Sequence, residues 1–188
     1  YGKYIQDFKA LDYKGNELKV VKVDENSWSI SNGVQLDKVE YLVNDTYDTE
    51  TEVADAVFSP AGTNISKGSN FMLNLHGFVG YFDGFKETPY NILVHKPEAL
   101  VATTSLFLEP NRKPDALWDG FMAKRYFEVI DNPIMYTKPN TEAFEINGIT
   151  VRLSLFSPNG VYKAADLKER MVSMMGAQKK FLGDVDTT

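Results

Sequence analysis

Two histidines are the first residues in this sequence that could do chemistry. His76 and His95 stand nineteen positions apart, and the chain holds no cysteine. A hydrolytic zinc site needs three protein ligands, usually histidine with a carboxylate or a cysteine. No H-E-x-x-H motif is present to place two imidazoles on one face of a helix. Both histidines are therefore predicted to be surface or structural residues, and no metal ligand is predicted in this chain.

Other reactive arrangements are missing in the same way. A nucleophilic serine needs a strained G-x-S-x-G elbow, whereas Ser69 lies in a predicted loop with no helix after it. Gly77, Gly80 and Gly84 lack the Lys-Ser/Thr ending and the helix of a phosphate loop. The acidic segment from Asn44 to Glu52 does not fit an EF-hand and is predicted to be a solvated loop or strand edge. The sequence predicts no catalytic residue, and whether the protein is an enzyme stays open.

Composition sets the class of protein. The 188 residues are 43% hydrophobic and 13% aromatic, enough for one domain, or one domain with an attached element. A net charge of -6 argues against a nucleic-acid partner, because phosphate binding needs a basic face. No apolar run approaches the roughly 18 residues of a membrane span. The first residue is Tyr1 and not methionine, so we expect a trimmed chain. A periplasmic or extracytoplasmic location is favoured over a cytoplasmic one, but the compartment stays open.

The elements that must position these residues are mostly strands. Phe71 to Leu75 alternates apolar and polar side chains, and Tyr90 to His95 is predicted to be a second strand. The turn from Gly77 to Phe85 between them contains three glycines and four aromatic rings, so its backbone is expected to approach another group closely. This turn either packs its rings over the end of a sheet or forms a recognition edge.

The rest of the chain favours antiparallel hairpins. The dipeptide Asn147-Gly148 is the strongest hairpin signal in the sequence. One segment, Phe121 to Ile130, is instead predicted to be a short helix. The predicted fold is mainly β, an antiparallel β-sandwich-like domain with a C-terminal amphipathic α-helix. The other predicted strands are Leu18–Val23, Trp28–Ile30, Val39–Val43, Ala99–Leu108, Ile134–Thr137, Glu142–Ile146 and Ile149–Phe156.

A change of period after residue 160 predicts the helix. Asp166 and Glu169 are expected to form its N-cap box, Gly183 its end, and Gly176 a close contact within it. We therefore divide the chain into a β-rich domain at residues 1–160 and a helical segment at 161–188. The apolar stripe that predicts the helix consists of Leu167, Met171, Met174, Met175, Phe181 and Leu182.

The chain also resembles a known family along nearly its whole length. Its opening, Tyr1 to Phe8, is similar to the P-G-S-Y-x-I-x-D-F segment near the start of the glycyl aminopeptidase family of zinc metallopeptidases. Further pieces keep that family's order: Gly15-Asn16-Glu17-Leu18 with Trp28, Ala61-Gly62-Thr63-Asn64, Gly77-Phe78-Val79-Gly80-Tyr81-Phe82, Tyr126 with Asp131-Asn132-Pro133, and Gln178-Lys179-Lys180-Phe181-Leu182-Gly183.

The resemblance implies a non-catalytic N-terminal domain whose first strands are missing. In this family a thermolysin-like domain that holds zinc follows, so zinc and the catalytic residues are expected outside this chain. The domain's partners would be its own catalytic domain and the peptide substrate of the parent enzyme. In related aminopeptidases a strand of this domain borders the cleft; here Asn74 and His76 would face it, with Tyr81 and Phe82 in the following turn.

A second interpretation is a stand-alone β-sandwich module that binds carbohydrate or protein. Trp28, Tyr81, Phe82 and Phe85 could then stack on sugar rings. A purely structural, adhesion-type domain is a third interpretation that rests on β content alone.

Overall fold

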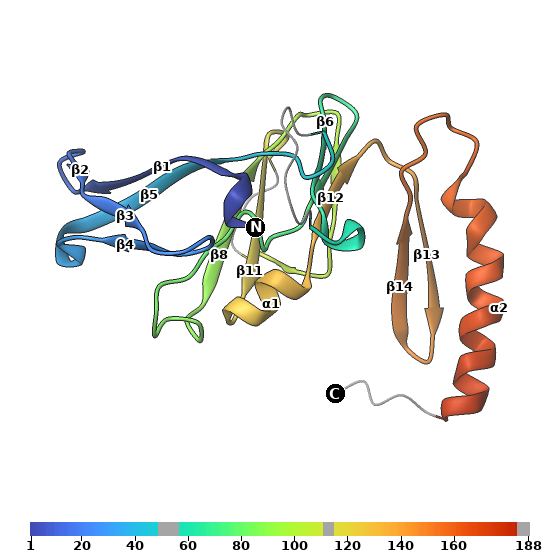
Figure 1. Ribbon diagram of the computed structural model, residues 1–188. Helices are drawn as coiled ribbons and strands as arrows, with labels where there is room; N and C mark the ends of the chain where they lie inside the picture. The colour runs from blue at the N-terminus through green and yellow to red at the C-terminus, as the bar shows by residue number, and fades with distance from the viewer. Residues whose placement is uncertain (49–56, 111–114, 184–188) are drawn as a thin grey trace.

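A computed structural model describes residues 1–48, 57–110 and 115–183. The fold is mainly β, with antiparallel sheets and a C-terminal helix, as the sequence predicts (Figure 1). Short 3-10 turns precede β1, β5 and β6. The strands are β1 (Ile5–Asp12), β2 (Glu17–Leu18), β3 (Val20–Lys22), β4 (Trp28–Ile30), β5 (Leu36–Val43), β6 (Asn64–Ser66), β7 (Asn70–Leu73), β8 (Tyr90–His95), β9 (Val101–Thr103), β10 (Phe107–Leu108), β11 (Trp118–Ala123), β12 (Ile134–Thr137), β13 (Thr141–Ile146) and β14 (Ile149–Ser154), and the α-helices are α1 (Tyr126–Asp131) and α2 (Ala164–Leu182).

The strands form three larger sheets and two hairpins. The sheet orders are β2-β1-β5, β10-β11-β8 and β6-β7-β12-β9, and the hairpins are β3-β4 and β13-β14. The blue strands β1 to β5 extend to one side of the body, and β13, β14 and α2 lie on the other (Figure 1). The main core lies between them, around β7, β11, β12 and α1; its buried members are Leu75, Leu100, Leu106, Phe121, Ala123, Val129, Ile134 and Tyr136.

Local sequence signals located several elements correctly. β8, β4 and β12 have the predicted bounds. Asn147 and Gly148 both adopt positive φ, 55° and 76°, which is what a two-residue hairpin turn of the predicted kind requires. The left-handed backbone strongly favours this pair because asparagine tolerates that region and glycine has no Cβ to clash.

The predicted helix at residues 121–130 is wrong in its first half. Phe121 lies in β11, where it pairs with Ile92 of β8 and Leu108 of β10. The helix α1 begins only at Tyr126 and fills the remaining part of the predicted range. Phe121 is 2% exposed, so burial in a central strand outweighs the weak helical spacing of this segment.

Two details predicted for the C-terminal helix are also wrong. α2 has no N-cap box at Asp166; instead its first N–H, from Ala164, donates to the Asn140 side-chain oxygen at 2.9 Å. A Cβ added at Gly176 would meet nothing within 4 Å, so the expected close contact is not there. Gly183 does end the helix, with φ 84° and its N–H bonded to the carbonyl of Lys179.

The acidic segment after β5 has a structural role where it is described. Asp45 is 6% exposed, and its carboxylate accepts the backbone N–H groups of Tyr47 at 2.6 Å, of Asp48 at 3.1 Å and of Ile65. It therefore ties the end of β5 to β6, two segments separated by a long connection. Residues 49–52 of the predicted acidic loop and residues 184–188 of the predicted helical segment lie outside the described residues.

We predict that Asp45→Ala lowers the free energy of unfolding by about 3 kcal/mol, because three backbone N–H groups lose their charged, buried acceptor. Asp45→Asn keeps one carbonyl oxygen and should lose less. Urea denaturation measures both, with the exposed Asp37→Ala as the matched control. Equal stability of Asp45→Ala and Asp37→Ala would contradict this role.

Candidate functional site

The candidate site is built around the turn that follows β7. Leu75 anchors this turn in the core at 2% exposure, and the N–H groups of Phe78 and Val79 donate to its carbonyl at 3.1 and 3.0 Å. The expected close approach does not occur at Gly80 or Gly84, where a Cβ would meet nothing within 4 Å; at Gly77 the nearest atoms would lie 3.7 Å away. Gly84 instead has a positive φ of 84°, a left-handed backbone conformation that favours glycine over other residues at this position.

Two tyrosine hydroxyls fasten this turn from different elements. Tyr41 of β5 donates to the carbonyl of Phe78 at 2.6 Å, and Tyr126 of α1 donates to the carbonyl of Val79 at 2.9 Å. Burial raises the pKa of Tyr41. Burial, with the neighbouring tyrosines, raises the pKa of Tyr126 to about 12. Both hydroxyls therefore remain protonated donors over the physiological pH range.

A groove of about 560 Å³ lies beside the turn, between it and strands β1, β4 and β5. Phe8 stacks on Trp28 and on Tyr41, with ring centroids 4.8 and 5.7 Å apart. The other rings along the groove are Tyr1, Phe78, Tyr81, Phe82 and Tyr126. Polar groups are fewer, with Asn26, Ser27, His76 and Asp83 among them. The groove is thus an aromatic surface with a few polar positions, suited to holding a partly apolar ligand.

Three of the four predicted cleft residues, His76, Tyr81 and Phe82, line this groove. Asn74 is not among the lining residues; its side-chain oxygen accepts the N–H of His76 at 3.3 Å. The His76 ring stacks on Tyr1 with ring centroids 5.2 Å apart, and burial lowers the pKa of His76. Whether a substrate contacts any of the four stays a prediction.

Sequence reasoning missed part of the groove. Phe8, Tyr41 and Tyr126 line it but come from β1, β5 and α1, which are distant in the sequence. The spacing of Phe8 fits a helix as well as a strand, and nothing local links this residue to the turn.

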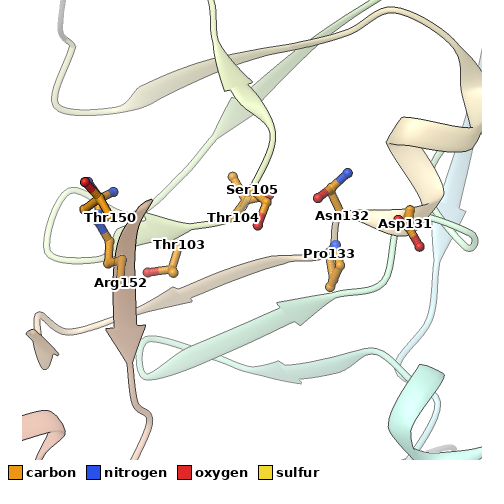
Figure 2. A pocket seen from close by; sticks show the side chains of 8 residues that line it. All are labelled: Thr103, Thr104, Ser105, Asp131, Asn132, Pro133, Thr150 and Arg152. Atoms are coloured by element: carbon orange, nitrogen blue, oxygen red, sulfur yellow. The ribbon is translucent and has the colours of Figure 1, made fainter. Parts of the chain in front are cut away.

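A second hollow, of about 450 Å³, lies between the body and the β13-β14 hairpin (Figure 2). Its walls are polar, with Thr103, Thr104 and Ser105 on one side and Thr150 and Arg152 on β14. Asp131, Asn132 and Pro133, at the end of α1, complete the lining. The Thr103 hydroxyl donates to the hydroxyl of Ser154 at 2.9 Å, which links the body to the hairpin.

Metal ligation does not fit the part of the chain that the structure describes. Within those residues, no three His, Cys, Asp or Glu side chains are grouped so that they could hold a metal ion. His76, which follows β7, packs on Tyr1, whereas His95 at the end of β8 packs on Trp118 with ring centroids 4.8 Å apart.

No described helix is both long and apolar enough to span a membrane.

Fold and site together define a β-rich domain with an aromatic groove. The chain belongs to the family described as the Peptidase M61 N-terminal domain, whose model matches residues 1–138. The resemblance to the N-terminal domain of a zinc metallopeptidase family is thereby confirmed.

A solved structure shows the same fold. It is that of an aminopeptidase N family protein from Idiomarina loihiensis, with a TM-score of 0.77 and 18% sequence identity. The match covers 95% of this chain and 28% of that chain, so this chain spans less than a third of the related protein. Curated protein sequences give no match.

We predict that Tyr41→Phe and Tyr126→Phe each lower the free energy of unfolding by about 1 kcal/mol, since each leaves a turn carbonyl without its donor. Chemical denaturation of both variants is the measurement. Tyr13→Phe is the matched control, because Tyr13 is 75% exposed. Variants as stable as this control would show that the hydroxyls do not hold the turn.

We also predict a loss of stability in alkali from Tyr126. Its folded pKa of about 12 lies above the ordinary value of 10.0, so between these values the folded state keeps a proton that the unfolded chain has lost. The free energy of unfolding therefore falls as the pH rises through this window. Tyr126→Phe should make that fall shallower and remove a late step from the tyrosinate absorbance titration. An unchanged titration would contradict the assignment.

Proposed function

We propose that this chain is the non-catalytic N-terminal domain of a glycyl-aminopeptidase-like zinc metallopeptidase. In this proposal it supports the peptidase domain and borders the cleft in which the peptide lies. The observation that carries the proposal is the family match over residues 1–138. In this proposal, zinc and its water-activating chemistry belong to the peptidase domain.

The aromatic groove supports the cleft-bordering part of this proposal. Tyr81 and Phe82 are 41% and 53% exposed, so they are available to a ligand, while the turn that carries them is fixed by Tyr41 and Tyr126. A wall that positions a substrate must be rigid, because misplacement of a bound peptide slows its reaction steeply. The turn therefore has both the exposure and the restraint that such a wall needs.

The alternative of a carbohydrate-binding module has less support. Sugar stacking needs an open ring face, but Phe8 stacks on Trp28 and the Lys22 ammonium lies over the same ring at 5.2 Å from its centroid. Over the Tyr81 ring, the Lys86 ammonium lies 4.3 Å from the centroid. Two of the rings proposed for stacking on sugars thus already have neighbours.

The proposal that zinc and catalysis belong to another domain is tested with the purified chain. After dialysis against zinc, elemental analysis should find well under one zinc per chain, and the chain should not cleave glycyl substrates. Cleavage that depends on stoichiometric zinc would overturn the proposal. Titration with a glycan panel tests the alternative, which saturable binding lost on Tyr81→Ala would favour.

In the peptidase that contains this domain, we predict that Tyr81→Ala and Phe82→Ala raise KM several-fold and leave kcat largely unchanged. Such side chains bind the peptide away from the reacting bond and so act equally on ground state and transition state. Steady-state kinetics measures this. Phe107→Ala is the matched control, because Phe107 is an exposed aromatic outside the groove lining. Identical kinetics for all three variants would contradict a cleft role.

A further inference from the structure

Strand β1 contains a residue with a strained backbone. Asp7 has a φ of 52°, in the left-handed region that residues other than glycine rarely adopt within a strand. The register of β1 against its long neighbour β5 shifts at the same place, between Gln6 and Lys9 (Figure 1). Asp7 and Phe8 of β1 therefore lie opposite a single residue of β5, Tyr41. This is a β-bulge of the kind in which glycine usually takes the left-handed position.

The bulge decides which side chains of β1 face the aromatic groove. Ile5 and Phe8 both line the groove, although they are three positions apart in the strand. In a regular strand, residues an odd number of positions apart point to opposite faces of the sheet. The additional residue at the bulge brings Ile5 and Phe8 to the same face. On β5, Val39 and Tyr41 are two positions apart and line the groove by ordinary alternation.

Phe8 connects the bulge to the turn after β7. Its ring stacks on Trp28 and on Tyr41, with interplanar angles of 6° and 8°. The Tyr41 hydroxyl in turn donates to the carbonyl of Phe78 in that turn, at 2.6 Å. Contact with the Phe8 ring restricts the Tyr41 ring and so the direction in which its hydroxyl points. A change in the position of Phe8 would therefore reach the groove wall.

We propose that Asp7 is a positioning residue, whose left-handed backbone turns Phe8 into the groove and thereby holds Tyr41 against the turn. The Asp7 side chain is exposed and is not among the residues that line the groove, so its effect comes through the backbone. Aspartate tolerates the left-handed region better than most residues do, which makes it suitable at this position. Bulges are frequent beside binding sites because they re-aim a side chain.

Two substitutions at residue 7 separate the effect of the backbone from that of the carboxylate. Asp7→Gly and Asp7→Val both remove the carboxylate, but glycine adopts the left-handed region readily and a β-branched residue avoids it. Acrylamide quenching of Trp28 fluorescence reports whether the Phe8 ring still covers Trp28. The Trp118→Phe background serves for this measurement, because it leaves Trp28 as the only tryptophan.

In the 188-residue chain, Asp7→Val should raise the quenching constant about twofold, because the Trp28 ring loses its stacking partner. Asp7→Gly should leave the constant unchanged, and Phe8→Leu gives the reference value for a lost stack. If Asp7→Val does not fold, Asp7→Ala replaces it, since alanine also disfavours the left-handed region and should raise quenching in the same direction. Equal quenching constants for the glycine variant and the valine or alanine variant would overturn the proposal.

The consequence for a bound peptide rests on the proposed function and is measured in the peptidase that contains this domain. Asp7→Val should raise KM several-fold with kcat largely unchanged, whereas Asp7→Gly should keep the KM of the unsubstituted enzyme. A raised KM for Tyr81→Ala but not for Asp7→Val would overturn the positioning role and leave the proposed function standing. An unchanged KM in both would contradict the proposed function, and the quenching constants would still decide whether Asp7 places Phe8.

Discussion

The turn after β7 keeps its shape because its carbonyls meet hydroxyl donors from two separate parts of the fold. Tyr41 reaches it from β5 and Tyr126 from α1, while Leu75 holds its base in the core. The sheet of β1, β2 and β5 is thereby fixed against the body through side chains as well as through packing. Because burial raises the pKa of both half-buried tyrosines, both bonds persist over the ordinary pH range, and the groove beside them has one stable wall.

This restraint supports the proposed role of the domain beside a peptide cleft. Its exposed rings, Tyr81 and Phe82, stand on a backbone that cannot move freely, so a bound peptide would meet a surface of fixed shape. Under the proposed function, this domain would position the peptide, and the peptidase domain would supply the metal.

Turns and helix ends that depend on neighbouring residues could be predicted from the sequence. Contacts between residues that are far apart in the sequence could not. Asn147-Gly148 fixes a hairpin by its own backbone preferences, and Gly183 ends α2 for the same reason. By contrast, the N–H of Ala164 is capped by Asn140, 24 positions earlier, which no local pattern reveals. The groove shows the same limit: glycines and aromatics marked the turn, but its partners on β1, β5 and α1 arrive only through tertiary packing.

In the proposed function, the groove wall borders the peptide cleft of the parent enzyme. A crystal structure of that enzyme with a bound peptide analogue is the decisive measurement. We expect heavy atoms of the analogue within about 4.5 Å of Tyr81 or Phe82, with the hydrogen bonds from Tyr41 and Tyr126 to the turn intact. A structure in which the turn faces solvent, on the side of the enzyme away from the analogue, would contradict it.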